Sequence, residues 1–567
     1  MRTYRCLLIA DFNIENLASY LNHGKTVPVI EATVAPYGPV VQSLMSGNFS
    51  EGRNDKNLDF ISVWTQPQCV SPSFARALNF ESVSYEQILK EVDDFCSLII
   101  QRGKYEEYIL IASWVIPTNV RGYGLLDLRD GLGLANILNK MNLRMVENLK
   151  EQKNIFILNA QKWVESSGNK AFNPKMWYMA KIAFGNEVFR RAANDIENFC
   201  RAVAGQYKKL VIVDLDDTLW GGVLADESLK NIRLGGHDPI GEAFVDFQKT
   251  LKALTNKGVL LGIVSKNDEK FVLEAINQHP EMVLKQKDFA AWRINWKDKA
   301  QNIVDLVSEL NLGLQSVVFI DDNPAERARV REALPEVYVP EWPQDKMLYA
   351  STLCELPCFD TAFISQEDLS RSAMYVSEQE RKELKSTFSS YEDWLKTLEV
   401  NVRVERMDSN NIQRMAQLLN KTNQMNLTTR RLSEEELRKW AEQENNSLWA
   451  VRVSDKFGDS GLTGIMSLCV ENKKGKIIDF VLSCRVMGRK IEETMVHVLC
   501  SYALELNLKE IYAEFIPTQR NKPCFDFWRN SGFSFNQPIN QFSWNLEKEY
   551  NLPHFIKLER PLLCYES

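Results

Sequence analysis

The sequence predicts a multidomain protein of the α/β class, and three observations support this prediction. The chain has 567 residues, more than one hydrophobic core normally serves. As far as about residue 345, fully apolar runs of strand length alternate with longer amphipathic stretches, as expected for parallel sheets covered by helices on both faces. From about residue 396, apolar and polar residues alternate as in half-exposed strands, so the last part is predicted to be α+β.

These patterns divide the chain into four segments. Residues 1–200 are expected to form a first α/β domain, with strands in YRCLLIADFN, LDFISVWTQP, YILIASWVIP and NIFILNAQ. Residues 205–345 form a second alternating unit, 346–395 a charged helical linker, and 396–567 the α+β domain. We find no internal repeat and no low-complexity tract.

Composition excludes several classes of function. The net charge is −7 and no run of lysine or arginine is present, which argues against a nucleic-acid partner. The eleven cysteines are scattered without a CxxC pair, as in the reduced thiols of a cytoplasmic protein. The apolar run at the N-terminus is cut short by Asp11, too early for a signal peptide, and no stretch is long enough for a transmembrane span. We therefore expect a soluble cytoplasmic protein with no membrane partner.

The stretch KLVIVDLDDTLWGG, residues 209–222, places Asp214, Asp216 and Asp217 directly after an apolar strand. Carboxylates this close repel one another and need a cation or a shared proton. A calcium-binding loop is excluded because its sixth and twelfth positions would be Leu219 and Ala225. A solvated acidic turn or a helix N-cap accounts for one or two carboxylates, but not for the polar residues that follow later strands.

Those later residues each follow another apolar strand. Ser265 ends LLGIVS and offers a hydroxyl to a phosphate oxygen. Lys297 and Lys299 lie at a predicted helix start, where ammonium and backbone N–H groups together favour an anion. Asp321 and Asp322 end VVFIDD and supply the oxygen ligands that magnesium takes. Because the carboxyl ends of parallel strands open on one edge of a sheet, these segments can converge there.

This set resembles the haloacid dehalogenase (HAD) superfamily of phosphotransferases, whose DxDx[TV] signature corresponds to Asp214–Thr218. The resemblance implies a Rossmann-like core with Asp214 as nucleophile and Asp216 as general acid/base. Ser265 would bind phosphate, and one lysine would neutralise it; the helix start favours Lys299. The implied magnesium ligands are Asp214, Asp216, Asp321 and Asp322, and the implied substrate-binding residues are Thr218, Ser265, Lys266 and Asn267.

The intervals between these motifs predict an open site. From Thr218 to Ser265, and from Ser265 to Lys299, there is room for about one loop and one helix. Neither interval can hold a separate lid domain. A capless site of this kind suits a bulky or protein-tethered substrate.

The C-terminal part resembles the GNAT acyltransferases. Arg485 and Gly488 match the loop that binds pyrophosphate at a helix start, although Lys490 replaces the last small residue, and Asn521 lies in a stretch similar to the later strand and helix of that fold. The resemblance implies acyl transfer or, alternatively, a scaffold that grips a pantetheine arm or a partner protein. Cys484 is either an acyl-carrying nucleophile beside the helix or inert packing.

The N-terminal part resembles SGNH-type esterase and flavodoxin-like α/β folds. LLIADFN stands where SGNH esterases carry the nucleophilic serine, but it contains no serine. His23 is the one histidine of residues 1–200, so the Ser/His/Asp set of that family cannot be assembled in its usual order. We expect docking or substrate positioning here, not catalysis. ASWVIPTNVRGYG lines a ligand groove or, alternatively, is a core strand followed by a loop.

Taken together, DLDDTLWGGVLADE, RINWKDKAQNI, FIDDNPAERARVR, NKTNQMNLTTRR and SCRVMGR resemble the FkbH-like family of HAD proteins, which typically has Asn where Asp217 stands. The resemblance implies a glyceryltransferase/phosphatase that takes D-1,3-bisphosphoglycerate, removes phosphate and loads the glyceryl unit onto an acyl carrier protein as a thioester. Three alternatives remain. The first is a phosphatase for another phosphorylated sugar or acyl substrate, the second a phosphatase with the C-terminal part as a specificity module, and the third a binding protein with a silent site.

Overall fold

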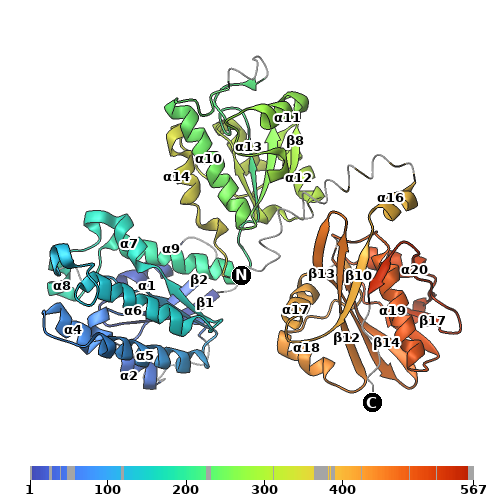
Figure 1. The fold of residues 1–567 in the computed structure, drawn as a ribbon, viewed down its shortest axis with the longest axis horizontal. Coiled ribbons are helices and arrows are strands. Elements are labelled where there is room, and N and C mark those ends of the chain that lie inside the picture. Colours follow the sequence, from blue (N-terminus) through green and yellow to red (C-terminus); the bar gives the residue numbers. More distant parts are fainter. Residues whose placement is uncertain are drawn as a thin grey trace. The chain divides into compact units, whose positions relative to one another are not determined.

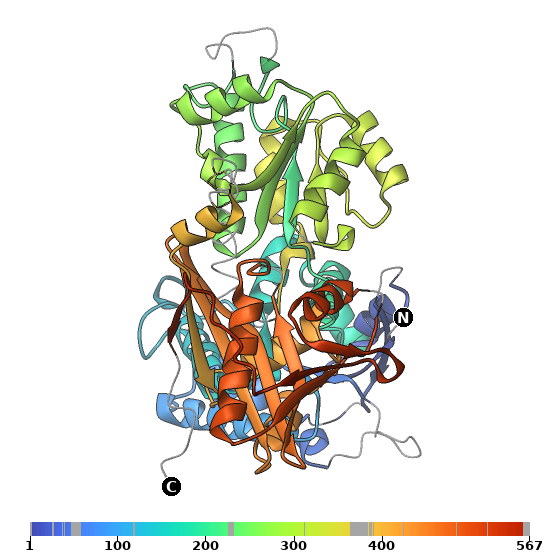
Figure 2. The ribbon, with the colours of Figure 1, turned by 90° about the vertical axis from the view of Figure 1, so that its right-hand side faces the viewer.

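In the computed structural model, the described residues form three sheets, drawn in Figures 1 and 2. It describes residues 3–24, 28–36, 38, 40–46, 58–116, 120–224, 232–310, 312–362, 381, 384, 388, 390–422, 424–483, 485–518 and 520–559. The chain divides into two compact units, Met1–Leu210 with Leu312–Ile364, and Val211–Asn311 with Ser365–Ser567. This division passes through the second sheet, so the domain limits given above remain a prediction.

The first sheet is parallel and has the strand order β2-β1-β3-β4-β5. Its strands are β1 (Thr3–Ala10), β2 (Val29–Val34), β3 (Phe60–Trp64), β4 (Tyr108–Ala112) and β5 (Ile155–Leu158). Leu8 packs in a cluster with α1 (Glu15–Asn22), α7 (Ala160–Ser167) and α9 (Asn186–Val203). Leu7 and Ile9 pack in another with α2 (Val40–Ser46), α4 (Pro72–Leu78), α5 (Tyr85–Gly103) and α6 (Leu134–Leu149). Helices therefore cover both faces, which explains the uninterrupted apolar runs.

The second sheet has four strands in the order β8-β7-β6-β9. They are β6 (Leu210–Val213), β7 (Leu260–Ser265), β8 (Phe289–Ile294) and β9 (Val317–Ile320), and β6, β7 and β9 are buried along their whole length. The helices after or between them are α10 (Pro239–Asn256), α11 (Glu269–Gln278), α12 (Lys299–Glu309) and α13 (Pro324–Ala333). Since β6 and β9 are hydrogen-bonded neighbours, the residues at their ends are positioned by one sheet.

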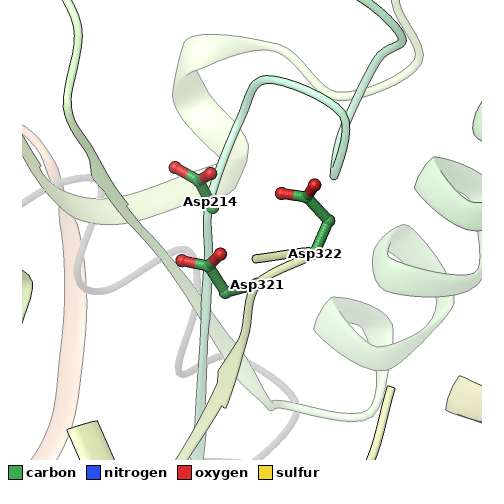
Figure 3. A group of neighbouring side chains, drawn as sticks. All are labelled: Asp214, Asp321 and Asp322. Carbon is green, nitrogen blue, oxygen red and sulfur yellow. The ribbon is translucent and has the colours of Figure 1, made fainter. Parts of the chain in front are cut away.

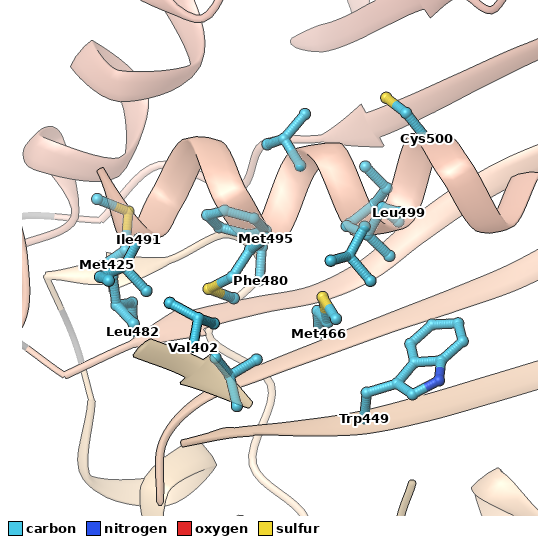
Figure 4. Packing of buried hydrophobic residues seen from close by; sticks show 14 of the residues in the cluster. Val402, Met425, Trp449, Met466, Phe480, Leu482, Ile491, Met495, Leu499 and Cys500 are labelled. Atoms are coloured by element: carbon cyan, nitrogen blue, oxygen red, sulfur yellow. The ribbon is translucent and has the colours of Figure 1, made fainter. Parts of the chain in front are cut away.

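The third sheet is mixed, with the order β16-β17-β15-β14-β13-β12-β10-β18 and β11 paired with β14. Its strands are β10 (Asn401–Arg406), β11 (Met425–Asn426), β12 (Asn446–Asp455), β13 (Gly458–Glu471), β14 (Lys474–Leu482), β15 (Glu510–Glu514), β16 (Ser534–Asn536), β17 (Gln541–Asn545) and β18 (Lys557–Glu559). Met495 and Leu499 of α19 (Ile491–Glu505) pack on Phe480 and Met466 (Figure 4). A second cluster joins α17 (Ile412–Lys421) and α18 (Glu434–Ala441) to the sheet.

The predicted fold class is confirmed: the chain is a multidomain α/β protein whose last sheet is mixed. The remaining described helices are α3 (Pro67–Val70), α8 (Pro174–Ala180), α14 (Tyr349–Cys354), α16 (Tyr391–Thr397) and α20 (Lys522–Asn530). Most of the charged stretch predicted as a helical linker lies outside the described residues. Across the helices that are described, none is both long enough and apolar enough to cross a membrane.

Candidate active site

Asp214 is the first residue after β6, and its side chain is buried. Its Oδ1 lies 3.1 Å from Nζ of Lys299, and its carboxylate accepts a hydrogen bond from the Ser265 side chain. Burial raises the pKa of Asp214, while Lys299 and the Ser265 hydrogen bond act in the opposite direction. The structure thus brings together three residues that the sequence placed at the ends of different strands or at a helix start.

Lys299 is the first residue of α12, whose N-cap is Asp298. Asp298 accepts a hydrogen bond from the backbone N–H of Gln301, as Asp does at helix starts. The Lys299 side chain is only 5% exposed, whereas Lys297 is exposed. A buried ammonium needs an anion beside it, and the Asp214 carboxylate is that anion.

Asp321 and Asp322 follow β9 and lie beside Asp214, as Figure 3 shows. One carboxylate oxygen from each of the three residues lies within 4.8 Å of the others. Asp214 and Asp321 are buried and Asp322 is half-buried. Three converging carboxylates in this position fit a small, hard divalent cation such as Mg²⁺.

Asp216 is not part of this three-carboxylate group, which differs from the ligand set implied by the sequence. Its Oδ1 accepts hydrogen bonds from Trp220 Nε1 at 3.0 Å and from the Leu224 N–H at 3.2 Å, and its Oδ2 accepts one from Asn267 Nδ2 at 3.0 Å. Burial raises the pKa of Asp216, against the effect of the hydrogen bonds from Trp220 and Leu224. These hydrogen bonds fix the Asp216 carboxylate outside the three-carboxylate group, and its pKa lies above the ordinary value.

The other expected phosphate-binding residues take different positions. Asn267, with 1% of its surface exposed, holds Asp216 through its side-chain amide. Thr218 is fully buried and its backbone N–H donates to the Leu215 carbonyl. Lys266 is exposed at the same edge of the sheet.

Two cationic residues that sequence reasoning missed support Asp321 and Asp322. Arg327, on α13, is buried and donates from Nη1 to the backbone carbonyls of both aspartates at 2.7 Å. Nζ of Lys346 lies 3.6 Å from Oδ2 of Asp322. Arg327 lies in the stretch FIDDNPAERARVR, one helical turn after Asn323, which is the N-cap of α13. This spacing could have indicated from the sequence that Arg327 reaches the aspartates before the helix.

The left-handed backbone of Asp217 explains which residue types suit that position. Its φ is +53°, which among residues with a side chain asparagine and aspartate tolerate best. Its Oδ1 accepts a hydrogen bond from the Gly222 N–H at 3.2 Å. Aspartate here therefore has a backbone role that asparagine would also fill.

The predicted acyl-transfer residues are less favourably placed. Cys484 lies outside the described residues. The Gly488 N–H, which a pyrophosphate would need, donates to Glu492 Oε1 at 2.8 Å, and the Gly488 carbonyl accepts from the Tyr391 hydroxyl. The Arg485 carbonyl accepts from Arg489 Nη2 at 2.6 Å.

Asn521 is buried and its amide is engaged with the backbone. Nδ2 donates to the carbonyls of Asn426 and Ile516, and Oδ1 accepts from the Thr518 N–H. These bonds tie the start of α20 to β11 and to the end of β15. The structure thus gives Asn521 a supporting position.

Comparison with known proteins adds one substantial likeness. The crystal structure of the N-terminal part of the protein BF1531 from Bacteroides fragilis, containing a phosphatase domain complexed with Mg, is 27% identical, with a TM-score of 0.56. The match covers 64% of this chain and 95% of that one.

Two acetyltransferases match a smaller part. Spermidine N-acetyltransferase from Vibrio cholerae, in complex with CoA and spermine, is 16% identical, covers 26% of this chain and 98% of that one, and has a TM-score of 0.22. A GNAT-family acetyltransferase from Staphylococcus aureus is 12% identical and has a TM-score of 0.22, and the match covers 26% of this chain and 99% of that one. No family model and no curated protein matches the chain.

Proposed function

We propose that this chain is a magnesium-dependent phosphohydrolase or phosphotransferase of the HAD type, coupled to transfer of the dephosphorylated acyl group. The observation that carries the proposal is the environment of Asp214, a buried carboxylate beside Lys299 and beside two further carboxylates. A nucleophilic carboxylate needs its phosphoryl target neutralised, and this arrangement supplies a fixed ammonium and a cation site for that purpose. The magnesium in the similar phosphatase domain supports the choice of metal.

The proposed reaction has two halves. An oxygen of Asp214 forms a bond to phosphorus as the bond from phosphorus to the leaving oxygen breaks, and Asp216 gives its proton to that oxygen. Water then attacks phosphorus, Asp216 takes a proton from the water, and the Asp214 carboxylate is released with inorganic phosphate. Lys299 and Ser265, which contact Asp214, would hold the phosphoryl oxygens.

Magnesium would be held by Asp214, Asp321 and Asp322. When bound, it would neutralise charge between the attacking carboxylate and the phosphoryl group. Arg327 would fix the two backbone carbonyls behind the ligands, and Lys346 would balance the charge of Asp322.

The proposed substrate is D-1,3-bisphosphoglycerate, and the proposed acceptor is the phosphopantetheine arm of an acyl carrier protein, as the FkbH-like resemblance implies. The chemistry at Asp214 would remove the phosphoryl group from the C3 oxygen. The pantetheine thiolate would attack the C1 carbonyl, so that the thioester bond forms as the C1–oxygen bond to the second phosphate breaks and that phosphate leaves.

The capless site that the motif spacing predicts would suit a protein-tethered acceptor. Val223, Phe271 and Trp296 follow β6, β7 and β8 and have 54%, 55% and 69% of their surfaces exposed. Large exposed apolar side chains often mark a surface that a macromolecule covers. The described cysteines are all free, which supports a reducing, cytoplasmic location.

A second candidate is a phosphatase for another phosphorylated sugar or acyl substrate, with the C-terminal part as a specificity module. The bond from the Gly488 N–H to Glu492 favours it, because the chain's own carboxylate occupies a donor that a pyrophosphate would use.

Intact-mass spectrometry distinguishes the two candidates. The protein is incubated with Mg²⁺, 1,3-bisphosphoglycerate and a holo carrier protein, and both proteins are then weighed. Glyceryl transfer adds a glyceryl group to the carrier and releases phosphate. Phosphate release with an unmodified carrier favours the second candidate, and no phosphate release with any phosphorylated substrate contradicts both.

A further inference from the structure

The N-terminal sheet carries a hollow that the proposed phosphoryl chemistry does not use. It has a volume of about 140 Å³ and opens to solvent. Its walls are the segment after β3, the segment after β4 and the region around α8. Carboxyl ends of parallel strands are where α/β folds bind ligands. Val115 and Ile116, from ASWVIP, follow β4 and lie in the wall.

The lining carries no charged side chain among the described residues. A buried ion without a counter-charge is costly, so the hollow suits an uncharged ligand. Its polar groups are the side chains of Thr65, Gln66, Gln68 and Asn173. Amides offer both donors and acceptors, which matches a ligand with several hydroxyl groups.

Gln68 is the last residue in a series of hydrogen bonds, and its side-chain oxygen accepts none from the described residues. Gln66 donates from its backbone N–H to both Asp11 oxygens, at 3.2 and 2.9 Å, and its Oε1 accepts from Gln68 Nε2 at 3.0 Å. This fixes the direction of the Gln68 amide, whose Oε1 is buried and accepts no hydrogen bond. A buried acceptor left unpaired costs about 1–3 kcal/mol, which a donor on a ligand would recover.

The apolar part of the wall is aromatic. Phe184 is buried and stacks on Trp64 with ring centroids 4.8 Å apart, which makes that side of the hollow rigid. Trp177 on α8 is half-buried, and Nζ of Lys181 lies 5.0 Å from its ring centroid. A flat aromatic face beside neutral amides suits the C–H face and hydroxyl edge of a sugar ring.

We propose that the N-terminal domain binds a neutral sugar, held by Gln68 and Asn173 and stacked against Trp177, without reacting with it. Covalent chemistry is disfavoured because the adjacent thiol, Cys69, donates to Asp11 and has its pKa raised to about 12, mainly by burial. This binding role is independent of the phosphoryl chemistry proposed above.

Saturation-transfer-difference NMR with N-acetyl-D-glucosamine and methyl α-D-glucoside tests the proposal on the full chain. Transfer to at least one sugar is expected with the wild-type protein. Gln68→Leu should weaken it about tenfold, because one hydrogen bond to the ligand is lost. Trp177→Ala, on a partly exposed helix, removes the stacking face with less risk to folding and should also weaken transfer.

Two controls separate this site from other surfaces. Tyr178→Ala changes an exposed neighbour of Trp177 that does not line the hollow and should leave transfer unchanged. Asp214→Asn should also leave it unchanged, even if it abolishes phosphate release. The proposal would be overturned if the wild type showed transfer to neither sugar. It would also be overturned if Gln68→Leu and Trp177→Ala both showed the same transfer as the wild type.

Discussion

At the scale of single residues, Asp214 and Asp216 have the same side chain but different surroundings. Asp214 faces an ammonium and two carboxylates, whereas Asp216 accepts three hydrogen bonds from an indole, an amide and a backbone N–H. Paired carboxylates with such different partners can divide nucleophilic and acid–base roles. The motif alone names both residues, but it does not show this difference.

Asp321→Asn is expected to abolish the effect of magnesium on stability. The substitution removes one of three crowded carboxylates, so without metal the melting temperature should rise or stay equal, because repulsion falls. Mg²⁺ is expected to raise the melting temperature of the wild type by binding the folded state, and should not raise that of Asp321→Asn. Differential scanning fluorimetry with and without Mg²⁺ measures this, with Asp305→Asn, an exposed carboxylate on α12, as control. An unchanged magnesium shift in Asp321→Asn would contradict the ligand assignment.

Glu492→Gln is expected to stabilise the protein at high pH. Burial raises the pKa of Glu492 to about 7, above its ordinary value of 4.5, so the folded state loses stability as pH rises through about 7. Glutamine keeps the acceptor for the Gly488 N–H but does not ionise, which is worth on the order of 3 kcal/mol at pH 8.

Thermal melts at pH 8 and pH 4.5 test this prediction. The advantage of Glu492→Gln should be large at pH 8 and small at pH 4.5. Glu505→Gln, an exposed glutamate at the end of the same helix, should show no such pH dependence. An advantage of equal size at both pH values would show that Glu492 titrates normally.

At the scale of elements, the sequence predicted strands better than the directions of side chains. Apolar runs such as VVFI predict buried strands because both faces of such a strand are covered, and the strands are indeed buried. The metal set was harder, because Asp216 and Asp214 are separated by one residue and only the turn after β6 decides where each carboxylate points. The hydrogen bond from Asn267 to Asp216 joins residues 51 positions apart, so no local pattern reveals it.

The turn between β9 and α13 depends on Arg327, which holds two consecutive carbonyls with one nitrogen. Arg327→Lys keeps the charge but replaces the planar guanidinium with a flexible ammonium. We expect magnesium affinity to fall by about 10- to 100-fold, as is usual when support behind metal ligands is lost. Titration of the magnesium-dependent rate measures it, with Arg329→Lys, an exposed arginine on the same helix, as control. Equal affinity in both variants would remove Arg327 from this role.

At the scale of the whole molecule, the three described sheets each carry a different feature. The first has a hollow lined by uncharged residues, the second has the group of carboxylates, and the third packs against a helix preceded by a backbone N–H, that of Gly488, which is already hydrogen-bonded within the chain. Their order along the chain was predictable from the alternation of apolar runs. The contacts of Gly488 and Asn521 come from residues that no motif includes.

Trp296→Ala is expected to lower the activity of the protein toward large substrates only. This side chain is 69% exposed and follows β8, so its loss should leave the hydrolysis of a small aryl phosphate within about twofold. Transfer to a carrier protein should fall about tenfold, because an exposed aromatic anchor is lost. Tyr105→Ala, 81% exposed in the first domain, is the control. Equal losses on both substrates would assign Trp296 to the chemistry or to the fold instead.

The most direct test of the central claim is to locate the phosphoryl group during turnover. The wild-type protein is mixed with Mg²⁺ and a phosphorylated substrate, quenched in acid and mapped by peptide mass spectrometry. We expect one phosphoryl group on Asp214, and in Asp214→Asn neither this adduct nor phosphate release above about one thousandth of the wild-type rate. Phosphate release at the wild-type rate by a folded Asp214→Asn protein, or a phosphoryl group on another residue, would contradict the account.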